Sequence, residues 1–473
     1  MLQYLLKRIL IFIPTLLVIS LLAFGLSKIA PGDPVELKLR GFGPDQQNLA
    51  NAERIYRETA DFLGLNKPVF YVGLTSAAYP DTLYNILRRD HRENLSKLIA
   101  QYGNWKPISD YYQQLLKMNY PLQEVSARQE SNTFRSVRSS LQQLFLSHAD
   151  VRITSLLEEA ETQALQDSSL QAALLGPIRE LRSSYETIKT EARPDLLYLP
   201  DLKWYGLDNQ YHNWLTGFLQ LDFGISYYDS RPVADKMKDA LFWTVLINGI
   251  AILLAYMLSI PLGVFSAIWK GSVFDRASTI VLFILYSLPS FWIGTMLLVF
   301  FTTPEYGMDW FPSIGLGNLP PEASFWSRFW ETASHLGLPV FCLAYGALAF
   351  ISRQMRGGML NVIRQDYIRT AWAKGLSSRA VIWKHAFRNS LFPIITMFAN
   401  IFPAVFAGSV AIEVIFNIPG MGKLTIDAIN QRDWPVVYTV LMLSAILTMA
   451  GILIADVLYA WADPRVSYSR NKR

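Results

Sequence analysis

Six long stretches of the chain contain no charged residue, and no other feature of the sequence limits the possible folds so strongly. A helix needs about 20 apolar residues to cross the roughly 30 Å hydrocarbon core of a bilayer. We expect the shortest stretch to extend back past His335. A soluble core helix would explain any one run, but six together predict an all-α polytopic membrane protein with six transmembrane helices. The runs cover residues 9–26, 241–269, 277–304, 336–352, 389–412 and 434–455.

The composition and the first apolar run support this prediction. Hydrophobic residues make up 51% of the chain and charged residues only 17%, whereas soluble domains carry about 25% charged residues. Lys7 and Arg8 precede the first run, as in a signal peptide, but its 18 apolar residues exceed the usual length of about 7–15. We therefore expect a retained helix. The single cysteine, Cys342, excludes an internal disulfide.

Lysine and arginine are distributed unevenly among the short connections between the runs. The N-terminus, the connections after the second and fourth runs and the C-terminal tail hold sixteen of them, against three at 303–335 and 417–436. Because these residues accumulate on the cytoplasmic side, both termini are predicted to be cytoplasmic. Membrane topology then accounts for the net charge of +5, and no nucleic-acid partner is expected. The expected parts are the N-terminus with the first helix (1–30), an extracytoplasmic segment (31–240), a five-helix core (241–465) with a cytoplasmic loop (353–390), and a cytoplasmic tail (466–473).

The extracytoplasmic segment contains a second kind of sequence. Its middle, about 75–203, is polar and nearly balanced in charge, and apolar residues recur at helical spacing, as at Leu174, Ile178 and Leu181. Turn-like sequences such as "QYGNWKP" and "LLGP" separate the periodic stretches. We predict a mainly helical domain of four to six helices, inserted between the first and second transmembrane helices.

The stretch "DYIRTAWAKGLSSRAVIWKHAFRNSLFP" (366–393) is basic and half apolar, and it connects two apolar runs. Its basic residues at every fifth position do not share one helix face, because five residues rotate by about 140°. This spacing argues against a basic amphipathic helix lying on lipid. Gly375 is expected to end a short helix at 366–374. From the residues alone two interpretations stay open: a helix that contacts a partner protein, or an ordinary cytoplasmic loop.

The stretch closely resembles the signature loop of permease subunits of ABC importers, in the form found in the dipeptide/oligopeptide/nickel branch. The general pattern E-A-A-x-x-x-G corresponds to Arg369, Thr370, Ala371 and Gly375, with arginine for the leading glutamate, as is usual in that branch. The resemblance covers about 1–73 and 204–466 and leaves 75–203 unexplained. Other matching motifs are, in chain order, "APGDP" (30–34), "LGLNKPVFY" (63–71), "LDFGISYYDSRPV" (221–233), "SLPSFWIG" (287–294), "VIFNIPGMGKL" (414–424), "INQRDWPVV" (429–437) and "ADPRV" (462–466).

This resemblance implies the type I ABC importer permease fold, in a multi-pass protein of the bacterial inner membrane. The implied function is translocation of peptides delivered by an extracytoplasmic binding protein. The implied partners are that protein, a second homologous permease subunit, two ATP-binding subunits and the lipid bilayer. ATP and Mg²⁺ would be bound by the ATP-binding subunits, so this chain is expected to hold no cofactor. The coupling loop that would contact those subunits contains Asp366, Tyr367, Arg369, Thr370, Ala371, Lys374, Gly375 and Leu376.

The residues themselves indicate no catalytic, cofactor or metal site. "PGMGK" (419–423) is not a phosphate-binding loop, since Asn417 and Leu424 stand where such a loop needs glycine and Ser/Thr. The chain is therefore not expected to hydrolyse ATP. Polar or kink-forming residues in apolar runs are candidates for a translocation pathway or gate, although a helix-end contact is the favoured explanation for the last of them. These candidates are Asn400, Phe402, Pro403 and Glu413.

Two other functions remain open at this point. Relatives in the same branch carry nickel or other small solutes, so the peptide substrate is an expectation. A non-transporting membrane scaffold could use 75–203 to hold partners, but it would not need a loop that matches importer permeases. Co-purification of an ATPase would distinguish an importer from a scaffold.

Overall fold

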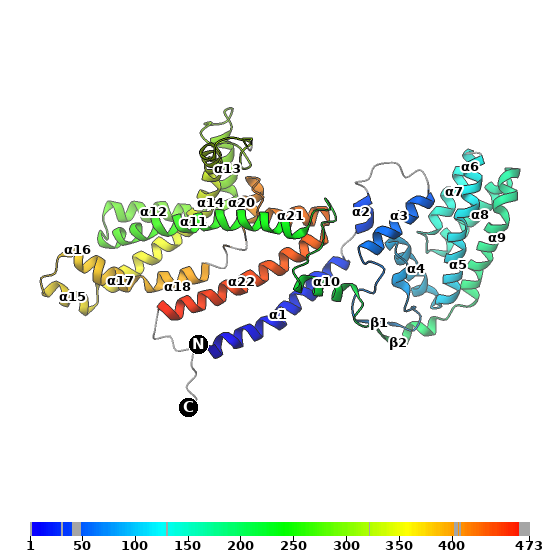
Figure 1. Ribbon diagram of the computed structural model, residues 1–473, viewed down its shortest axis with the longest axis horizontal. Coiled ribbons are helices and arrows are strands. Elements are labelled where there is room, and N and C mark those ends of the chain that lie inside the picture. The colour runs from blue at the N-terminus through cyan, green and yellow to red at the C-terminus, as the bar shows by residue number, and fades with distance from the viewer. Residues whose placement is uncertain are drawn as a thin grey trace. The chain divides into compact units, whose positions relative to one another are not determined.

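The computed structural model describes residues 2–29, 32–39, 49–128, 131–320, 322–401, 405 and 408–462. The chain divides into two compact units, coloured by residue number in Figure 1. The membrane unit comprises Met1–Ala30 and Leu221–Arg473, and the 31–220 unit comprises Pro31–Gln220. The two units are described separately below.

The membrane unit is helical throughout its described residues, apart from connections and one isolated bridge between Ile225 and Pro232. Its helices are α1 (Leu2–Ile29), α11 (Val233–Ile268), α12 (Val273–Ser287), α13 (Ser290–Thr302), α14 (Phe325–Ile363), α15 (Asp366–Ala373), α16 (Ser378–Ala380), the π-helical turn η4 (Val381–Ala386), α17 (Phe387–Ser390), α18 (Phe392–Ile401), α20 (Val410–Ile415), α21 (Met421–Gln431) and α22 (Trp434–Ala462).

Four helices are long and apolar enough to cross a membrane, within Leu5–Ile29, Val233–Ile268, Phe325–Ile363 and Trp434–Val457. They contain four of the six predicted runs. The run at 277–304 forms α12 and α13, which are bent by 97° at the break before Ser290. Leu288 precedes Pro289, and a residue in this position disfavours the helical conformation. The run at 389–412 forms the short helices α18 and α20, and part of the chain between them lies outside the described residues.

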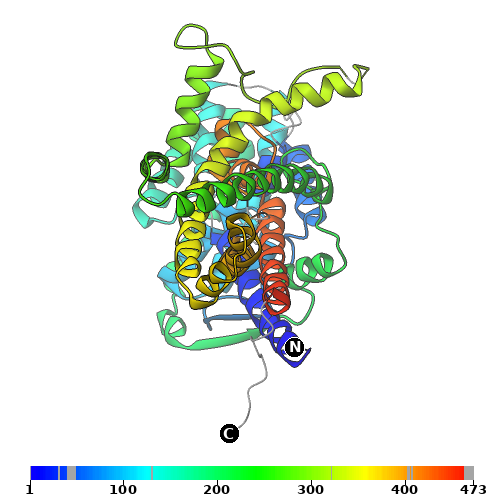
Figure 2. The same ribbon diagram turned by 90° about the vertical axis from the view of Figure 1, so that its left-hand side faces the viewer.

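Helices α1 and α22 lie side by side in opposite directions, blue and red in Figures 1 and 2. Tyr438, near the start of α22, donates a 2.7 Å hydrogen bond to the Ser27 hydroxyl near the end of α1. At the other end, Arg8 lies 3.0 Å from Asp456. A polar contact at each end satisfies groups that would be costly in an apolar environment, and together they fix the antiparallel register.

The main core of the membrane unit lies between α11 and α14, which cross in Figure 2. Their backbones approach closely at Gly263, where an added Cβ would lie 2.6 Å from the Ser352 carbonyl oxygen. Nearby, the buried Ser259 hydroxyl donates to the Leu348 carbonyl at 3.0 Å. Small residues of this kind let membrane helices pack at short distance, so a larger side chain at position 263 would force the two helices apart.

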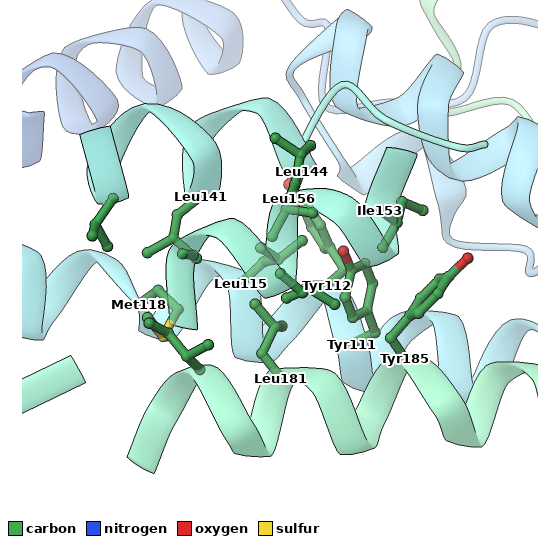
Figure 3. Close-up of a cluster of buried hydrophobic side chains, with 14 of the residues drawn as sticks. Tyr111, Tyr112, Leu115, Met118, Leu141, Leu144, Ile153, Leu156, Leu181 and Tyr185 are labelled. Carbon is green, nitrogen blue, oxygen red and sulfur yellow. The ribbon is translucent and has the colours of Figure 1, made fainter. Parts of the chain in front are cut away.

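The 31–220 unit consists mainly of amphipathic helices around one large apolar core (Figure 3), and a smaller cluster includes Val35 and Tyr56. The predicted helical spacing is confirmed, because Leu174, Ile178 and Leu181 are all completely buried. The "LLGP" sequence, however, does not interrupt its helix, since Pro177 lies inside α9. The elements are α2 (Pro34–Leu39), α3 (Leu49–Phe62), β1 (Val72–Ser76), η2 (Leu83–Asn85), α4 (Arg89–Tyr102), α5 (Trp105–Lys117), α6 (Asn119–Arg128), α7 (Asn132–Leu144), α8 (Asp150–Leu165), α9 (Ser168–Thr190), η3 (Pro194–Tyr198), β2 (Pro200–Trp204) and α10 (Gln210–Leu219).

Strands β1 and β2 form an antiparallel ribbon at the two ends of the predicted insertion. Val72 pairs with Trp204, and Ser76 pairs with Pro200. The buried Lys203 extends from this ribbon to Asp81, at 2.8 Å. The chain therefore enters and leaves α4–α9 at neighbouring positions of one ribbon.

Candidate functional site

The loop between α14 and α18 contains the predicted short helix, α15, which ends at Gly375. Gly375 has a φ of +76°, a conformation that costs L-residues with a side chain roughly 1–2 kcal/mol. The Leu376 N–H donates to the Ala371 carbonyl at 3.4 Å, and the Gly375 N–H donates to the Trp372 carbonyl at 2.9 Å. This pair of bonds is the Schellman arrangement, which ends a helix by satisfying its last carbonyls.

Helix α15 has one buried face and one exposed face. Ile368 is 1% exposed and Ala371 is 7% exposed, and the helix packs against η4. Tyr367 and Trp372, by contrast, are each 45% exposed. Asp366 and Arg369 also direct their side chains into solvent. The helix is therefore held from behind and presents aromatic and charged groups outward, a combination that is frequent in protein interfaces.

An open cleft of about 640 Å³ lies along α16, η4 and α17, in the chain that follows α15. Arg379, Lys384 and Arg388 contribute cationic groups to it, and Trp383 and Phe387 contribute aromatic rings. Trp383 also contacts Phe265 of α11, with ring centroids 6.2 Å apart. The loop is thus in contact with a long membrane helix through this aromatic pair.

A buried ion pair connects α12 to α14 near this loop in the sequence. Asp275, 4% exposed, accepts hydrogen bonds from Arg356 Nε at 2.7 Å and Nη2 at 2.8 Å. It also accepts one from the Gly271 N–H at 2.9 Å. Sequence reasoning missed this pair. The only local signal was Ser272, whose hydroxyl accepts from the Asp275 N–H at the start of α12, as in a helix-capping sequence.

Glu413 of α20 is completely buried, and its carboxylate lies beside the start of α21. Its carboxylate accepts from the Lys423 N–H at 3.0 Å and the Ser409 N–H at 3.2 Å. Thr244 of α11 donates its hydroxyl to the same carboxylate at 3.1 Å and accepts from the Met421 N–H at 2.7 Å. Unpaired N–H groups at a helix N-terminus need such acceptors. Glu413 and Thr244 thus cap α21 from two other helices.

The glycine-rich sequence at the start of α21 allows this carboxylate to come close. An added Cβ at Gly420 would lie 2.5 Å from Glu413 Cδ, and one at Gly422 would lie 2.8 Å from the Val410 Cα. "PGMGK" is therefore a backbone cradle for a carboxylate of the same chain. Its glycines serve close packing, which agrees with the absence of a phosphate-loop pattern.

Two matching motifs that are far apart in the sequence meet at Asp433. This completely buried carboxylate accepts hydrogen bonds from the Ser226 hydroxyl and, at 2.9 Å, from the Tyr227 N–H. Lys236 lies 3.6 Å from Asp433 and 2.9 Å from Asp229. The contact joins "LDFGISYYDSRPV" to "INQRDWPVV". Sequence reasoning noted both motifs but gave no role to Asp433 or Ser226.

The remaining pathway candidates lie outside the part of the chain that can be described. Phe402 and Pro403 fall outside the described residues, and so does the side chain of Asn400 at the end of α18. Among the residues that are described, no group of three or more His, Cys, Asp or Glu side chains is placed to hold a metal ion.

These features define a class: a polytopic membrane protein in which buried carboxylates hold the connecting segments together by hydrogen bonds. A short, anchored helix lies between two of its apolar segments and presents one exposed face. The model of the family described as binding-protein-dependent transport system inner membrane component matches residues 259–468. The relatives reported below are at least 30% identical and are covered over most of their own length. The chain belongs to this family of inner-membrane transport components.

Three relatives illustrate the similarity. An oligopeptide transport system permease protein of Bacillus subtilis is 41% identical over 269 residues, which are 56% of this chain and 83% of the relative. A peptidoglycan transport system permease protein of Agrobacterium fabrum is 33% identical over 258 residues, 54% of this chain and 71% of the relative. A probable peptide ABC transporter permease protein of Sinorhizobium fredii is 35% identical over 259 residues, 55% of this chain and 80% of the relative.

Proposed function

We propose that this chain is a permease subunit of a peptide importer and that α15 is its contact with an ATP-hydrolysing partner. The substrate class is supported by relatives whose names refer to oligopeptide, peptide and peptidoglycan transport. Membership of a binding-protein-dependent family supports a substrate-binding protein as a further partner. The complete assembly would contain two permeases, this chain and a homologous subunit, and two ATP-binding subunits.

The observation that carries the proposal is the two-faced character of α15. Ile368 and Ala371 anchor it to η4, whereas Tyr367 and Trp372 remain exposed. A short helix that is anchored behind and open in front can transmit a displacement of its partner to the membrane helices. An ordinary connecting loop needs neither the buried anchor nor the Schellman ending at Gly375.

The described geometry also supports a role for Glu413 at the gate, without direct contact with solute. Its carboxylate is enclosed by donors from α11, α21 and the chain before α20. A movement of any of these elements would break at least one hydrogen bond in a buried environment. We propose that Glu413 couples their positions, and that Asn400, Phe402 and Pro403 belong to the translocation pathway.

We further propose that both termini are cytoplasmic, that six helices span the membrane, and that 31–240 lies outside with 75–203 as an inserted domain. The antiparallel pairing of α1 and α22 supports termini on one side, because Arg8 and Asp456 meet at one end. Cysteines placed near residues 150 and 470, in a chain with Cys342 replaced, would test this orientation. An impermeant thiol reagent applied to intact cells should label only the first position, and labelling of residue 470 would contradict it.

The function itself is tested by purifying the chain from its native membrane and identifying what accompanies it. We expect an ATPase, a second permease and, with peptide present, a binding protein. Reconstituted vesicles should then accumulate peptide only when ATP is present on the side of the membrane that carries the ATPase. Uptake of a nickel complex but not of peptide would overturn the substrate class, and purification without any ATPase would favour a scaffold.

A further inference from the structure

A cleft of about 810 Å³ opens in the 31–220 unit, with one wall from α2 and α3 and the other from α4–α7. The two walls are tied together at its edge. The buried Tyr56 of α3 donates its hydroxyl to Asp33 and lies 3.3 Å from the Leu87 carbonyl. Arg89 donates to the Gly32 carbonyl at 3.1 Å. The cleft is therefore built jointly by the family-like segment and by the predicted insertion.

Five arginine and lysine residues line this cleft, and they differ in whether they already have a partner. Three of its arginines have partners within the protein. Arg54 lies 3.9 Å from Glu58, Arg88 lies over the Tyr56 ring at 4.9 Å, and Arg89 donates to Glu93 at 2.7 Å.

Two further cations of the cleft are differently placed. Neither Arg57 of α3 nor Lys117 of α5 has a carboxylate within 4.0 Å among the residues that the structure describes. Both residues are exposed. Arg57 belongs to the wall formed by α2 and α3, and Lys117 belongs to the wall formed by α4–α7. An anionic group that entered the cleft would find these two cations available from both sides.

Two of the arginines are already paired with Glu58 and Glu93, and three acidic residues line the cleft as well. They are Asp33, Glu36 and Asp90, against five arginine and lysine residues. Asp33 is already engaged, because it accepts from the Tyr56 hydroxyl and, at 2.8 Å, from the Val35 N–H. The preference for a ligand with negative charge therefore rests on Arg57 and Lys117, the two cations without a carboxylate within 4.0 Å among the described residues.

The other lining groups indicate the kind of anion. Four side-chain amides, which can both donate to and accept from a peptide backbone, line the cleft together with apolar surface. Tyr120 is 76% exposed and Leu146 is 59% exposed. A small inorganic anion could accept from the amide N–H groups, but it would use neither their carbonyl oxygens nor the apolar groups. The amides belong to Gln113, Asn119, Gln123 and Gln142.

We propose that this cleft binds short acidic peptides, with Arg57 and Lys117 as the groups that recognise their carboxylates. Guanidinium and ammonium groups make charge-assisted hydrogen bonds to carboxylates, and the amides would hold the peptide backbone. The site is separate from any pathway through the membrane unit. It deepens the proposed peptide import by adding a place where acidic peptides are held, but it can be tested without transport or an ATPase.

The test uses the purified full chain in nanodiscs of phosphatidylcholine, with binding measured by calorimetry. The probes are the capped tetrapeptides Glu-Ala-Glu-Ala, Gln-Ala-Gln-Ala and Lys-Ala-Lys-Ala. We expect the acidic peptide to bind on the order of tenfold more tightly than the other two. Its affinity should fall between about 50 mM and about 300 mM salt, because the contacts are partly open to solvent and screened.

Paired variants assign the effect to the cleft. Arg57→Gln with Lys117→Gln should weaken binding of the acidic peptide on the order of tenfold and leave the glutamine peptide unaffected. Lys97→Gln is the matched control, since Lys97 is exposed on α4 outside the cleft, and it should change nothing. Equal binding of all three peptides, or unchanged binding by the paired variant, would overturn the proposal. If the chain bound none of the three peptides but did bind vesicles that contain phosphatidylglycerol, the proposal would also be overturned, and the cleft would be assigned to lipid headgroups.

Discussion

Thr244 serves two hydrogen bonds at once, and it is the residue on which the cap of α21 can be tested most cleanly. Thr244→Val keeps the shape of the side chain but leaves the buried Met421 N–H without its acceptor and removes one donor from Glu413. A buried donor left unpaired costs about 1–3 kcal/mol. We expect faster hydrogen exchange at the start of α21 and a lower melting temperature in detergent.

A control variant distinguishes lost capping from a general effect of valine. Thr425 donates its hydroxyl only within α21, to the Met421 carbonyl, so Thr425→Val should alter exchange much less. If both variants behave alike, the hydroxyl of Thr244 has no special part in holding α21.

Glu161 offers a pH-dependent test in the 31–220 unit. Hydrogen bonds from the Arg179 and Arg182 guanidinium groups, at 2.9 and 3.1 Å, lower the pKa of this carboxyl below its usual value. A carboxyl whose pKa is lowered by folding contributes stability above its unfolded pKa, about 4.3, and this contribution is lost as the pH falls through the folded pKa. Glu161→Gln should therefore destabilise α8 and α9 at pH 7 by about 1 kcal/mol.

Hydrogen exchange of the α9 amides in the full chain measures this effect. The difference between wild type and Glu161→Gln should be largest near neutral pH and should shrink below about pH 4. Glu159→Gln is a suitable control, because Glu159 has no ion-pair partner among the described residues of this unit. A difference that grows on acidification would contradict the assignment.

At the scale of single elements, a substitution at the end of α15 can test backbone strain without steric conflict. A Cβ at Gly375 would meet nothing within 4 Å, so Gly375→Leu acts through its φ of +76° alone. We expect the cost, roughly 1–2 kcal/mol, to distort α15 and to reduce peptide uptake while leaving membrane insertion intact. Gly375→Asn should keep more uptake, since asparagine tolerates this conformation better. Equal uptake by wild type and Gly375→Leu would show that the helix end is not involved in coupling.

The same elements show what local sequence determines. The helices of the 31–220 unit were predictable because residues such as Leu174, Ile178 and Leu181 follow a 3.6-residue period on one buried face. The end of α15 was predictable because Gly375 can adopt a left-handed conformation. The faces of α15 were not. Tyr367, Ala371 and Lys374 lie on one side of an ideal helix, but Ala371 is buried and the other two are exposed.

Contacts between distant elements could not be obtained in this way. Asp433 and Ser226, or Asp275 and Arg356, are polar residues whose local sequence gives no partner, and only the packing of the helices brings each pair together. Pro289 could be expected to kink its run, but the size of the bend after Leu288, 97°, could not be derived from the sequence. A run of apolar residues predicts burial in lipid, whereas the direction of the chain depends on Pro289 and on the Tyr345 hydroxyl, which donates to the Leu288 carbonyl at 2.7 Å.

At the scale of the whole molecule, the ribbon of β1 and β2 offers a way to separate the permease from its additional helices. The chain is about one and a half times as long as its Bacillus subtilis relative, since the same 269 residues are 56% of one and 83% of the other. Thr75 and Asp201 are directly paired in the ribbon. A two-residue Asn-Gly turn, which favours tight antiparallel hairpins, can therefore replace residues 76–200 without displacing Val72 or Trp204.

We expect this shortened chain to insert into the membrane and to retain its ATPase partner, because α15 and the buried carboxylates of the membrane unit are unchanged. It should lose the binding of Glu-Ala-Glu-Ala, since α4–α7 form one wall of the cleft and carry Lys117. Uptake of a neutral peptide delivered by the binding protein should persist, whereas uptake of an acidic peptide should fall toward that of the paired Arg57 and Lys117 variant. Loss of all uptake with intact ATPase binding would instead assign the additional helices to the docking of the binding protein. Full acidic-peptide binding by the shortened chain would place that site outside the cleft.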